Sequence, residues 1–201
     1  MNREALREAR RSYYVGHLWN PFFIEGIKTL AYEAIEQTSW RGFDAVILPV
    51  GSGGLLLGVY KGFLEFNELN FIDSIPRVYG VQSITCAPIY EILHEKSLGK
   101  CSGEPLADGI AVPNPPRGKQ VADVIKKTKG DLVVVSDSEV IESFRKLAKM
   151  GFFVEPTSAT VLAALKKLVD SGDISKGERI FIPLTGFGLK ALDKLMKLKL
   201  L

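Results

Sequence analysis

Residues that commonly form metal sites or disulfide frameworks are scarce in this chain. Its 201 residues include two cysteines, Cys86 and Cys101, and two histidines, His17 and His94. The cysteines lack CxxC spacing, and the four residues do not form a recognisable set of metal ligands. We therefore expect no metal site. This cysteine usage is typical of a protein in a reducing, cytoplasmic compartment.

Long apolar runs and a dominant charge are also missing. No apolar run approaches the ~20 residues that span a bilayer, and the charged start, MNREALREARRSYY, has no signal-peptide core. With 26 basic and 23 acidic residues, the net charge is only +3. Such a balance does not favour nucleic acid or a membrane surface as a partner.

Apolar residues, at 46% of the chain, are sufficient for the core of one domain. Their spacing alternates between short buried runs and helical periodicity. Strands are predicted at 45–48, 77–82, 131–135 and 179–184. Helices are predicted at 22–37, after 54, at 87–93, 118–127 and 136–149, after 155, and at the C-terminus. This alternation predicts an α/β fold, with a doubly wound, mostly parallel sheet and helices on both faces, in a single three-layer domain.

The stretch from Ala45 to Lys61 contains the clearest local signal. A buried strand passes through Gly51-Ser52-Gly53-Gly54 into a helix. The unpaired N–H groups and the dipole of a helix N-terminus favour an anion, and glycines let a phosphate approach the backbone closely. The same glycines also fit a tight corner that binds nothing. Leu55-Leu56 after Gly54 excludes a P-loop, and Leu56 breaks the GxGxxG dinucleotide pattern.

A second glycine-bearing loop, Thr185-Gly186, also follows a predicted strand. Ligands of doubly wound sheets bind at the carboxyl ends of the strands. We therefore expect Gly51–Gly54 and Thr185-Gly186 to meet at one edge of the sheet.

Six motifs, taken together and in order, resemble one family of enzymes. The motifs are NPFFIEGIKT, VILPVGSGGLLLG, GVQSITCAPIY, ADGIAVPNPPR, VEPTSATVLAAL and LTGFGLK. They resemble the C-terminal, large-domain half of threonine synthase, a pyridoxal-phosphate enzyme of fold type II, the tryptophan-synthase-β type. The first is similar to the family's NPYxxEGQKT, with Ile27 in place of glutamine. Threonine and serine dehydratases share the ADGIAV-like stretch, while Gln82, EPTSA and TGxGLK favour the synthase branch.

The resemblance implies a role for several of these residues. Gly51, Ser52, Gly53 and Gly54 match the loop whose amides hold the phosphate of pyridoxal 5′-phosphate, so a phosphate-bearing small molecule is the expected ligand. Thr185 matches the hydroxyl residue that faces the pyridine nitrogen. A neutral hydroxyl there leaves the nitrogen less protonated and moderates the electron sink.

Other polar residues near these motifs have a structural interpretation. Glu155 stands at a helix N-terminus, where the dipole stabilises a carboxylate, and Asp108 precedes glycine as in ordinary turns. Lys28 and Lys61 are interpreted as solvated helix lysines. The C-terminal lysines are interpreted as the solvated face of a terminal helix: Lys190, Lys194, Lys197 and Lys199.

The family's Schiff-base lysine, carried by an FKDR-like segment, has no counterpart in this sequence. Covalent chemistry with the cofactor needs a lysine amine beside its aldehyde. We therefore predict no catalytic residue here, a tail or connection at residues 1–18, and an incomplete large domain, without its N-terminal half, at 19–201.

Three functions are compatible with an incomplete large domain that lacks the Schiff-base lysine. The chain is one subunit of a split enzyme, and a second chain supplies the lysine and the N-terminal half. Alternatively, it folds alone, retains the phosphate loop and catalyses nothing. In the third, it is a structural module that pairs with a second copy through an exposed apolar surface.

Overall fold

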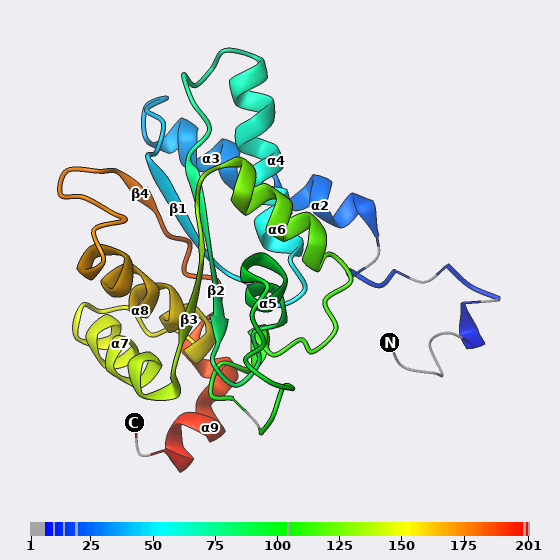
Figure 1. Ribbon diagram of the computed structural model, residues 1–201, viewed down its shortest axis with the longest axis vertical. Coiled ribbons are helices and arrows are strands. Elements are labelled where there is room, and N and C mark those ends of the chain that lie inside the picture. Colours follow the sequence, from blue (N-terminus) through cyan, green and yellow to red (C-terminus); the bar gives the residue numbers. More distant parts are fainter. Residues whose placement is uncertain are drawn as a thin grey trace.

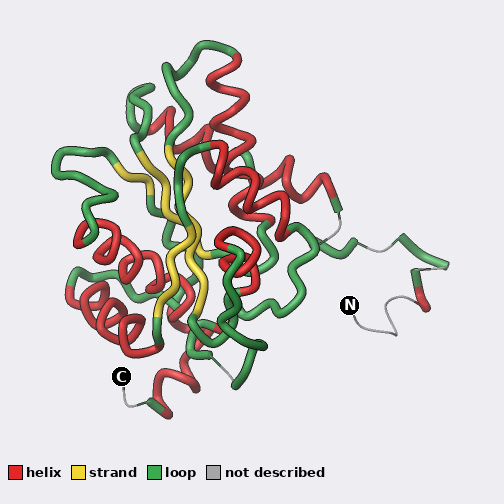
Figure 2. The backbone as a smooth tube through the Cα atoms, in the orientation of Figure 1, coloured by secondary structure: helices red, strands yellow, loops and turns green. Residues whose placement is uncertain are grey.

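A parallel sheet runs through the centre of the protein (Figures 1 and 2). The computed structural model describes residues 7–198 and 200, apart from 10, 14, 19 and 104, so the predicted N-terminal tail lies partly outside the described residues, as does Lys199. The strands stand in the order β3-β2-β1-β4, and every pairing is parallel. Their bounds are Ala45–Pro49 for β1, Arg77–Ser83 for β2, Leu132–Val135 for β3 and Ile180–Phe181 for β4.

Helices cover both faces of this sheet, as the alternating pattern predicts (Figure 1). Successive side chains of a strand point to opposite faces, and β1 shows this clearly. Val46 and Leu48 pack into a core with helices on one face, while Ala45 and Ile47 pack into the core on the other face. The first face carries α2 (Pro21–Ile27), α3 (Thr29–Gln37), α4 (Gly54–Glu68), α5 (Pro88–His94) and α6 (Gly118–Lys127). The second carries α7 (Asp137–Lys149), α8 (Pro156–Asp170) and α9 (Leu192–Lys197).

The path of the chain creates a crevice beside β1. From β1 the chain moves outward to β2 and β3, and it then crosses to the far side of β1 to form β4. Such a reversal of direction separates the loops that leave two neighbouring strands, so ligands bind at that point. Here the reversal lies between the carboxyl ends of β1 and β4.

Two predicted elements differ from the structure. The helix expected at 22–37 is divided into α2 and α3 at Lys28, because the Thr29 hydroxyl donates to the Gly26 carbonyl (2.9 Å) and Ala31 N–H donates to the Lys28 carbonyl (3.0 Å) in a tighter turn. The strand expected at 179–184 is reduced to Ile180–Phe181. Pro183 has no N–H to donate to a sheet, so pairing with β1 does not extend to the end of the predicted run.

Short 3₁₀ turns lie at Asp108–Ile110 (η1) and Gly188–Ala191 (η2).

Cys86 and Cys101 form a disulfide between the end of β2 and the following loop. The sequence interpretation did not expect this pairing, and a reducing compartment does not favour it. Within the described residues, no group of three or more His, Cys, Asp or Glu side chains is placed to hold a metal. None of the described helices is long and apolar enough to cross a membrane.

Candidate functional site

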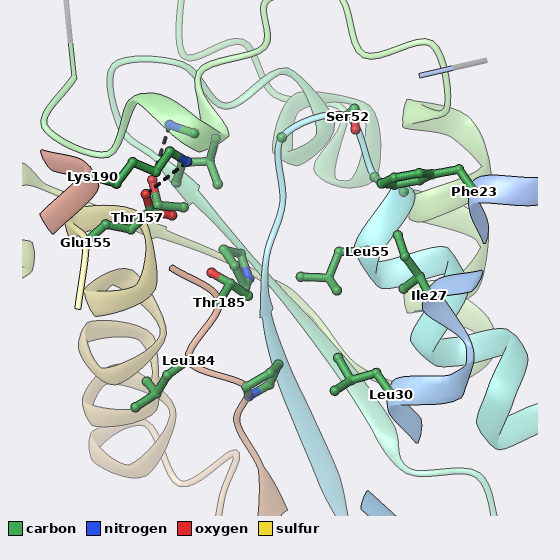
Figure 3. Close-up of a pocket in the computed structure, with 17 residues that line it drawn as sticks. Phe23, Ile27, Leu30, Ser52, Leu55, Glu155, Thr157, Leu184, Thr185 and Lys190 are labelled. Carbon is green, nitrogen blue, oxygen red and sulfur yellow. Dashed lines mark hydrogen bonds and ion pairs between the residues drawn. The ribbon is translucent and has the colours of Figure 1, made fainter. Parts of the chain in front are cut away.

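A cavity of about 570 Å³ lies at the carboxyl ends of β1 and β4, where the direction of the sheet reverses. Gly51, Ser52, Gly53, Gly54 and Thr185 all line it (Figure 3). The structure therefore brings together the two loops that the sequence places at one edge. Their binding roles remain predictions.

Residues 51–56 present an uninterrupted set of backbone donors. Among the described residues, no backbone carbonyl accepts a hydrogen bond from the N–H groups of this segment, and the first bond of α4 is from Leu57 to Gly53. These donors stand at the positive end of a 15-residue helix. The arrangement is suited to binding a phosphate group.

Gly53 and Gly54 contribute to this loop in different ways. Gly53 precedes α4 with φ = +92°, and a Cβ atom there would lie 2.4 Å from Val121 Cγ2. It therefore needs glycine both for its left-handed backbone and for its contact with α6. A Cβ on Gly54 would meet the Phe23 ring at an ordinary distance of 3.7 Å. Gly54 thus has room for a methyl group, and the absence of a side chain there keeps the cavity open.

The opposite wall is formed by side chains rather than by backbone. Ser158, on α8, is fully buried, and its Oγ accepts a hydrogen bond from Gly186 N–H at 2.7 Å. The same Oγ lies 3.0 Å from Thr185 Oγ1. Thr157 Oγ1 accepts from Gly109 N–H at 3.2 Å, which connects α8 to η1. The hydroxyl of Thr185 is thus held from behind by a buried partner.

Glu155 and Lys190 form an ion pair that lines the same cavity (Figure 3). Glu155 Oε2 lies 3.2 Å from Lys190 Nζ, and the side chains are 12% and 76% exposed. Glu155 makes no side-chain hydrogen bond to the start of α8. Glu155 thus occupies the N-cap position of α8, where the sequence interpretation places it, and it also pairs with Lys190, whose side chain stays largely exposed.

A recognisable sequence signal identifies Glu155 but not Lys190. Glutamate is not among the preferred N-cap residues, so a Glu-Pro start without a Ser, Thr, Asp or Asn cap is a reason to look for another partner. Lys190 follows the same helical spacing as the other C-terminal lysines, so the sequence does not single it out. Its contact with Glu155 becomes visible only in the folded protein. Asp108 is exposed, as a turn residue should be, and contacts Lys194 at 3.4 Å.

The side of the cavity that faces α2 is apolar. Phe23, Ile27 and Leu30 point into it from α2 and α3, opposite Glu155, Thr157 and Lys190 (Figure 3). Their spacing places them on one helical face. Part of this face therefore lines the cavity.

Lys28 and Lys61 are ion-paired and do not line the cavity. Lys28 Nζ lies 2.8 Å from Glu25 and 3.0 Å from Glu65, while Lys61 pairs with Glu25. Hydrogen bonds to Glu25 and Glu65 raise the pKa of Lys28 above its ordinary range. Hydrogen bonds from Lys28 and Lys61 lower the pKa of Glu25, and those from Tyr32 and Lys28 lower the pKa of Glu65. The two lysines therefore connect α2 to α4 instead of standing free in solvent.

Comparison with known proteins identifies the class to which this fold and site belong. The chain is a member of the pyridoxal-phosphate-dependent enzyme family, whose sequence profile matches residues 1–186. Within that family it is homologous to threonine synthases. It is 39% identical to the threonine synthase of Methanocaldococcus jannaschii over 178 residues, which are 87% of this chain and 44% of the relative. It is 32% identical to that of Methanosarcina acetivorans over 186 residues, 90% of this chain and 46% of the relative.

A solved structure supports the fold. The processed form of threonine deaminase isoform 2 from Solanum lycopersicum superimposes with a TM-score of 0.75 at 23% identity, covering 98% of this chain and 56% of that one. The chain spans less than half the length of either threonine synthase.

Pyridoxal phosphate is the cofactor of this family, and the residues present fit two parts of it. The free amides of residues 51–56 are suited to the phosphate, and a Cβ on Gly54 would reduce the space beside them. The Thr185 hydroxyl is suited to a hydrogen bond with the ring nitrogen. Lys190 is the only lysine among the described residues of the lining, and its amine is paired with Glu155.

Proposed function

We propose that this chain forms the phosphate-binding and ring-binding side of the pyridoxal-phosphate site of a threonine-synthase-type enzyme. The reaction would convert O-phosphohomoserine to threonine. One observation carries the proposal: residues 51–55, whose backbone amides have no carbonyl partner among the described residues, line the same cavity as Thr185, where the sheet reverses direction. The homology to threonine synthases supports the choice of reaction.

Each wall would perform a different task. Residues 51–56 would hold the phosphate, and Thr185 would bind the pyridine nitrogen through a neutral hydroxyl. Phe23, Ile27 and Leu30 would exclude water from one side of the ring. When bound, the cofactor supplies an electron sink for the bonds of the substrate's α-carbon.

The amine that joins the cofactor would come from a segment outside these residues, either in the rest of a longer protein or on a second chain. The position of Lys190 supports this assignment, because its side chain is 76% exposed and ion-paired with Glu155, whereas a nucleophilic lysine is activated by desolvation in an apolar pocket. We therefore expect the isolated chain to bind pyridoxal phosphate without catalysing the reaction.

A pair of glycine substitutions tests the phosphate assignment. Gly54→Ala places a methyl group in the loop, whereas Gly26→Ala places one on α2 with no atom within 4 Å. Titration with pyridoxal phosphate, followed by absorbance, should show at least about tenfold weaker binding for Gly54→Ala. The affinity of Gly26→Ala should equal that of the wild type. Equal affinities for all three proteins would remove the loop from the site.

A second candidate function is self-association. Phe187 and Leu189, at the start of η2, are 62% and 60% exposed, and exposed apolar side chains in one region favour association. Sedimentation of the isolated chain distinguishes this candidate. A monomer at all concentrations would exclude it, and a dimer that dissociates when Phe187 is replaced by serine would support it.

A further inference from the structure

The buried hydroxyl of Ser158 stands directly behind the hydroxyl of Thr185. Ser158 lies in the first turn of α8 and is 0% exposed. Three polar atoms surround its Oγ: Gly186 N at 2.7 Å, Thr185 Oγ1 at 3.0 Å and Gly186 O at 3.4 Å.

The direction of these hydrogen bonds follows from the number of available hydrogens. Gly186 N–H can only donate, so Ser158 Oγ accepts from it and has one hydrogen left to donate. That hydrogen can go to Thr185 Oγ1 at 3.0 Å or to the Gly186 carbonyl at 3.4 Å. The first distance is close to that of an ordinary O–H···O bond, and the second is long. The geometry therefore favours donation from Ser158 to Thr185.

This direction determines what Thr185 can offer to the cavity. A hydroxyl that accepts from Ser158 keeps its own hydrogen for another partner. In the reverse direction, Thr185 would spend its hydrogen on Ser158 and could only accept from a ligand. The chain of donors thus runs from Gly186 N–H through Ser158 to Thr185, whose own O–H remains available to a ligand in the cavity.

We propose that Ser158 is a positioning residue that fixes Thr185 as a hydrogen-bond donor toward the pyridine nitrogen of the cofactor. The inference rests on the proposed function, because it takes Thr185 as the residue that faces the ring. A ring nitrogen that receives a hydrogen bond must be unprotonated. Ser158 therefore sets the protonation state of the ring without touching it.

Other charged groups could also affect the ring nitrogen. The charged side chains among the described lining residues are Glu155 and Lys190, which carry opposite charges and form an ion pair at 3.2 Å. A free carboxylate beside the ring would stabilise the protonated nitrogen. The pairing with Lys190 limits this effect, so the hydroxyl chain can decide the protonation state.

The test uses 4′-deoxypyridoxine 5′-phosphate with ¹⁵N in its ring. This analogue has the phosphate and the ring nitrogen but no aldehyde, so its binding needs no lysine. Its ³¹P shift reports binding at the phosphate loop, and its ¹⁵N shift against pH gives the pKa of the bound ring nitrogen. In the wild-type protein this pKa should lie at least about one unit below that of the free analogue, the effect of one hydrogen bond made to a single protonation state.

Three variants separate positioning from packing. Ser158→Ala should raise the pKa of the bound ring nitrogen by about one unit while leaving the ³¹P shift unchanged. Thr185→Val should do the same, and the double variant should add nothing further. Thr160→Val removes another fully buried hydroxyl of α8, which donates to Thr157 O at 2.6 Å, and it should leave the ring pKa as in the wild type.

The possible failures are distinguishable. Unchanged ring titration in Ser158→Ala, or an equal rise in Thr160→Val, would overturn the role of Ser158 while the phosphate assignment stands. If the wild-type protein does not change the ³¹P shift, the proposed function fails, and the inference about Ser158 fails with it.

Discussion

The two walls of the cavity are built on different principles. The wall at residues 51–55 consists of backbone amides, and its glycines leave space for a ligand. The wall formed by α8 and Thr185 consists of side chains that hold one another in place: Glu155 with Lys190, and Ser158 with Thr185. The first wall therefore depends on the absence of side chains, and the second depends on contacts between side chains.

This difference determines how each wall can be disrupted. Adding a side-chain atom should disrupt the backbone wall, because the atom occupies space that its glycines leave free. Shortening a side chain there should do little, because the donors belong to the backbone. Removing an atom should damage the side-chain wall, because each group there depends on a partner. The comparison therefore predicts opposite sensitivities to substitutions that enlarge or shorten a residue.

The largest effect is expected at Gly53. Gly53→Ala forces a side chain into a backbone with φ = +92° and against Val121 Cγ2. The expected loss in the free energy of unfolding is about 3 kcal/mol, from strain and overpacking combined. Urea denaturation measures it.

Gly172→Ala is the matched control, because Gly172 has φ = +83° but no atom within 4 Å of the added Cβ. It should lose only about 1 kcal/mol. Equal losses at the two positions would show that the contact with α6 contributes nothing.

An intermediate effect is expected when the side-chain wall is shortened. Thr157→Val keeps the shape of the side chain but leaves Gly109 N–H without its acceptor. The free energy of unfolding should fall by about 1 kcal/mol, the net contribution of a part-buried hydrogen bond.

Thr29→Val supplies the comparison for this change. Its hydroxyl also bonds to backbone, at Gly26 O, but on an exposed part of α3. A loss below about 0.5 kcal/mol is expected there. A similar loss at both positions would contradict the dependence of the second wall on its partners.

The smallest effect concerns the support of α2, which carries Phe23 into the cavity. Lys28 and Lys61 lower the pKa of Glu25 below its ordinary value of 4.5. A carboxyl with a lowered folded-state pKa stabilises the fold above the unfolded pKa, and that stability is lost as pH falls through the folded pKa. Glu25→Gln should therefore flatten the fall in stability below pH 4.5.

Denaturation at several pH values on both sides of 4.5 measures that slope. Glu33→Gln, at an exposed site on α3, should leave it unchanged. A wild-type slope in Glu25→Gln would show that the ion pairs between α2 and α4 contribute nothing to stability.

Local sequence signals predicted most of the fold. The apolar run at Ala45–Leu48 and the Ser136–Glu139 capping box mark β1 and α7 because each depends on neighbouring residues alone. The break at Lys28 depends on a side-chain bond to backbone, and the short β4 depends on where pairing with β1 ends. Neither the helix break nor the strand end can be predicted from the spacing of apolar residues.

The candidate site divides in the same way. The glycine loop and Thr185 could be predicted because strand, turn and helix follow one another directly, and the sheet rule places both loops together. The pairing of Glu155 with Lys190 joins residues 35 positions apart, and that of Ser158 with Thr185 joins residues 27 apart. Such pairs arise from the packing of α8 against the loop after β4, and this packing has no local signature.

A titration of the isolated chain with pyridoxal phosphate, followed by borohydride reduction and mass analysis, decides whether the amine comes from elsewhere. We expect saturable binding through residues 51–55 and no reduced adduct on any lysine. A single reduced lysine adduct, with Lys190 as the first position to inspect, would contradict this expectation by showing that this chain supplies its own amine.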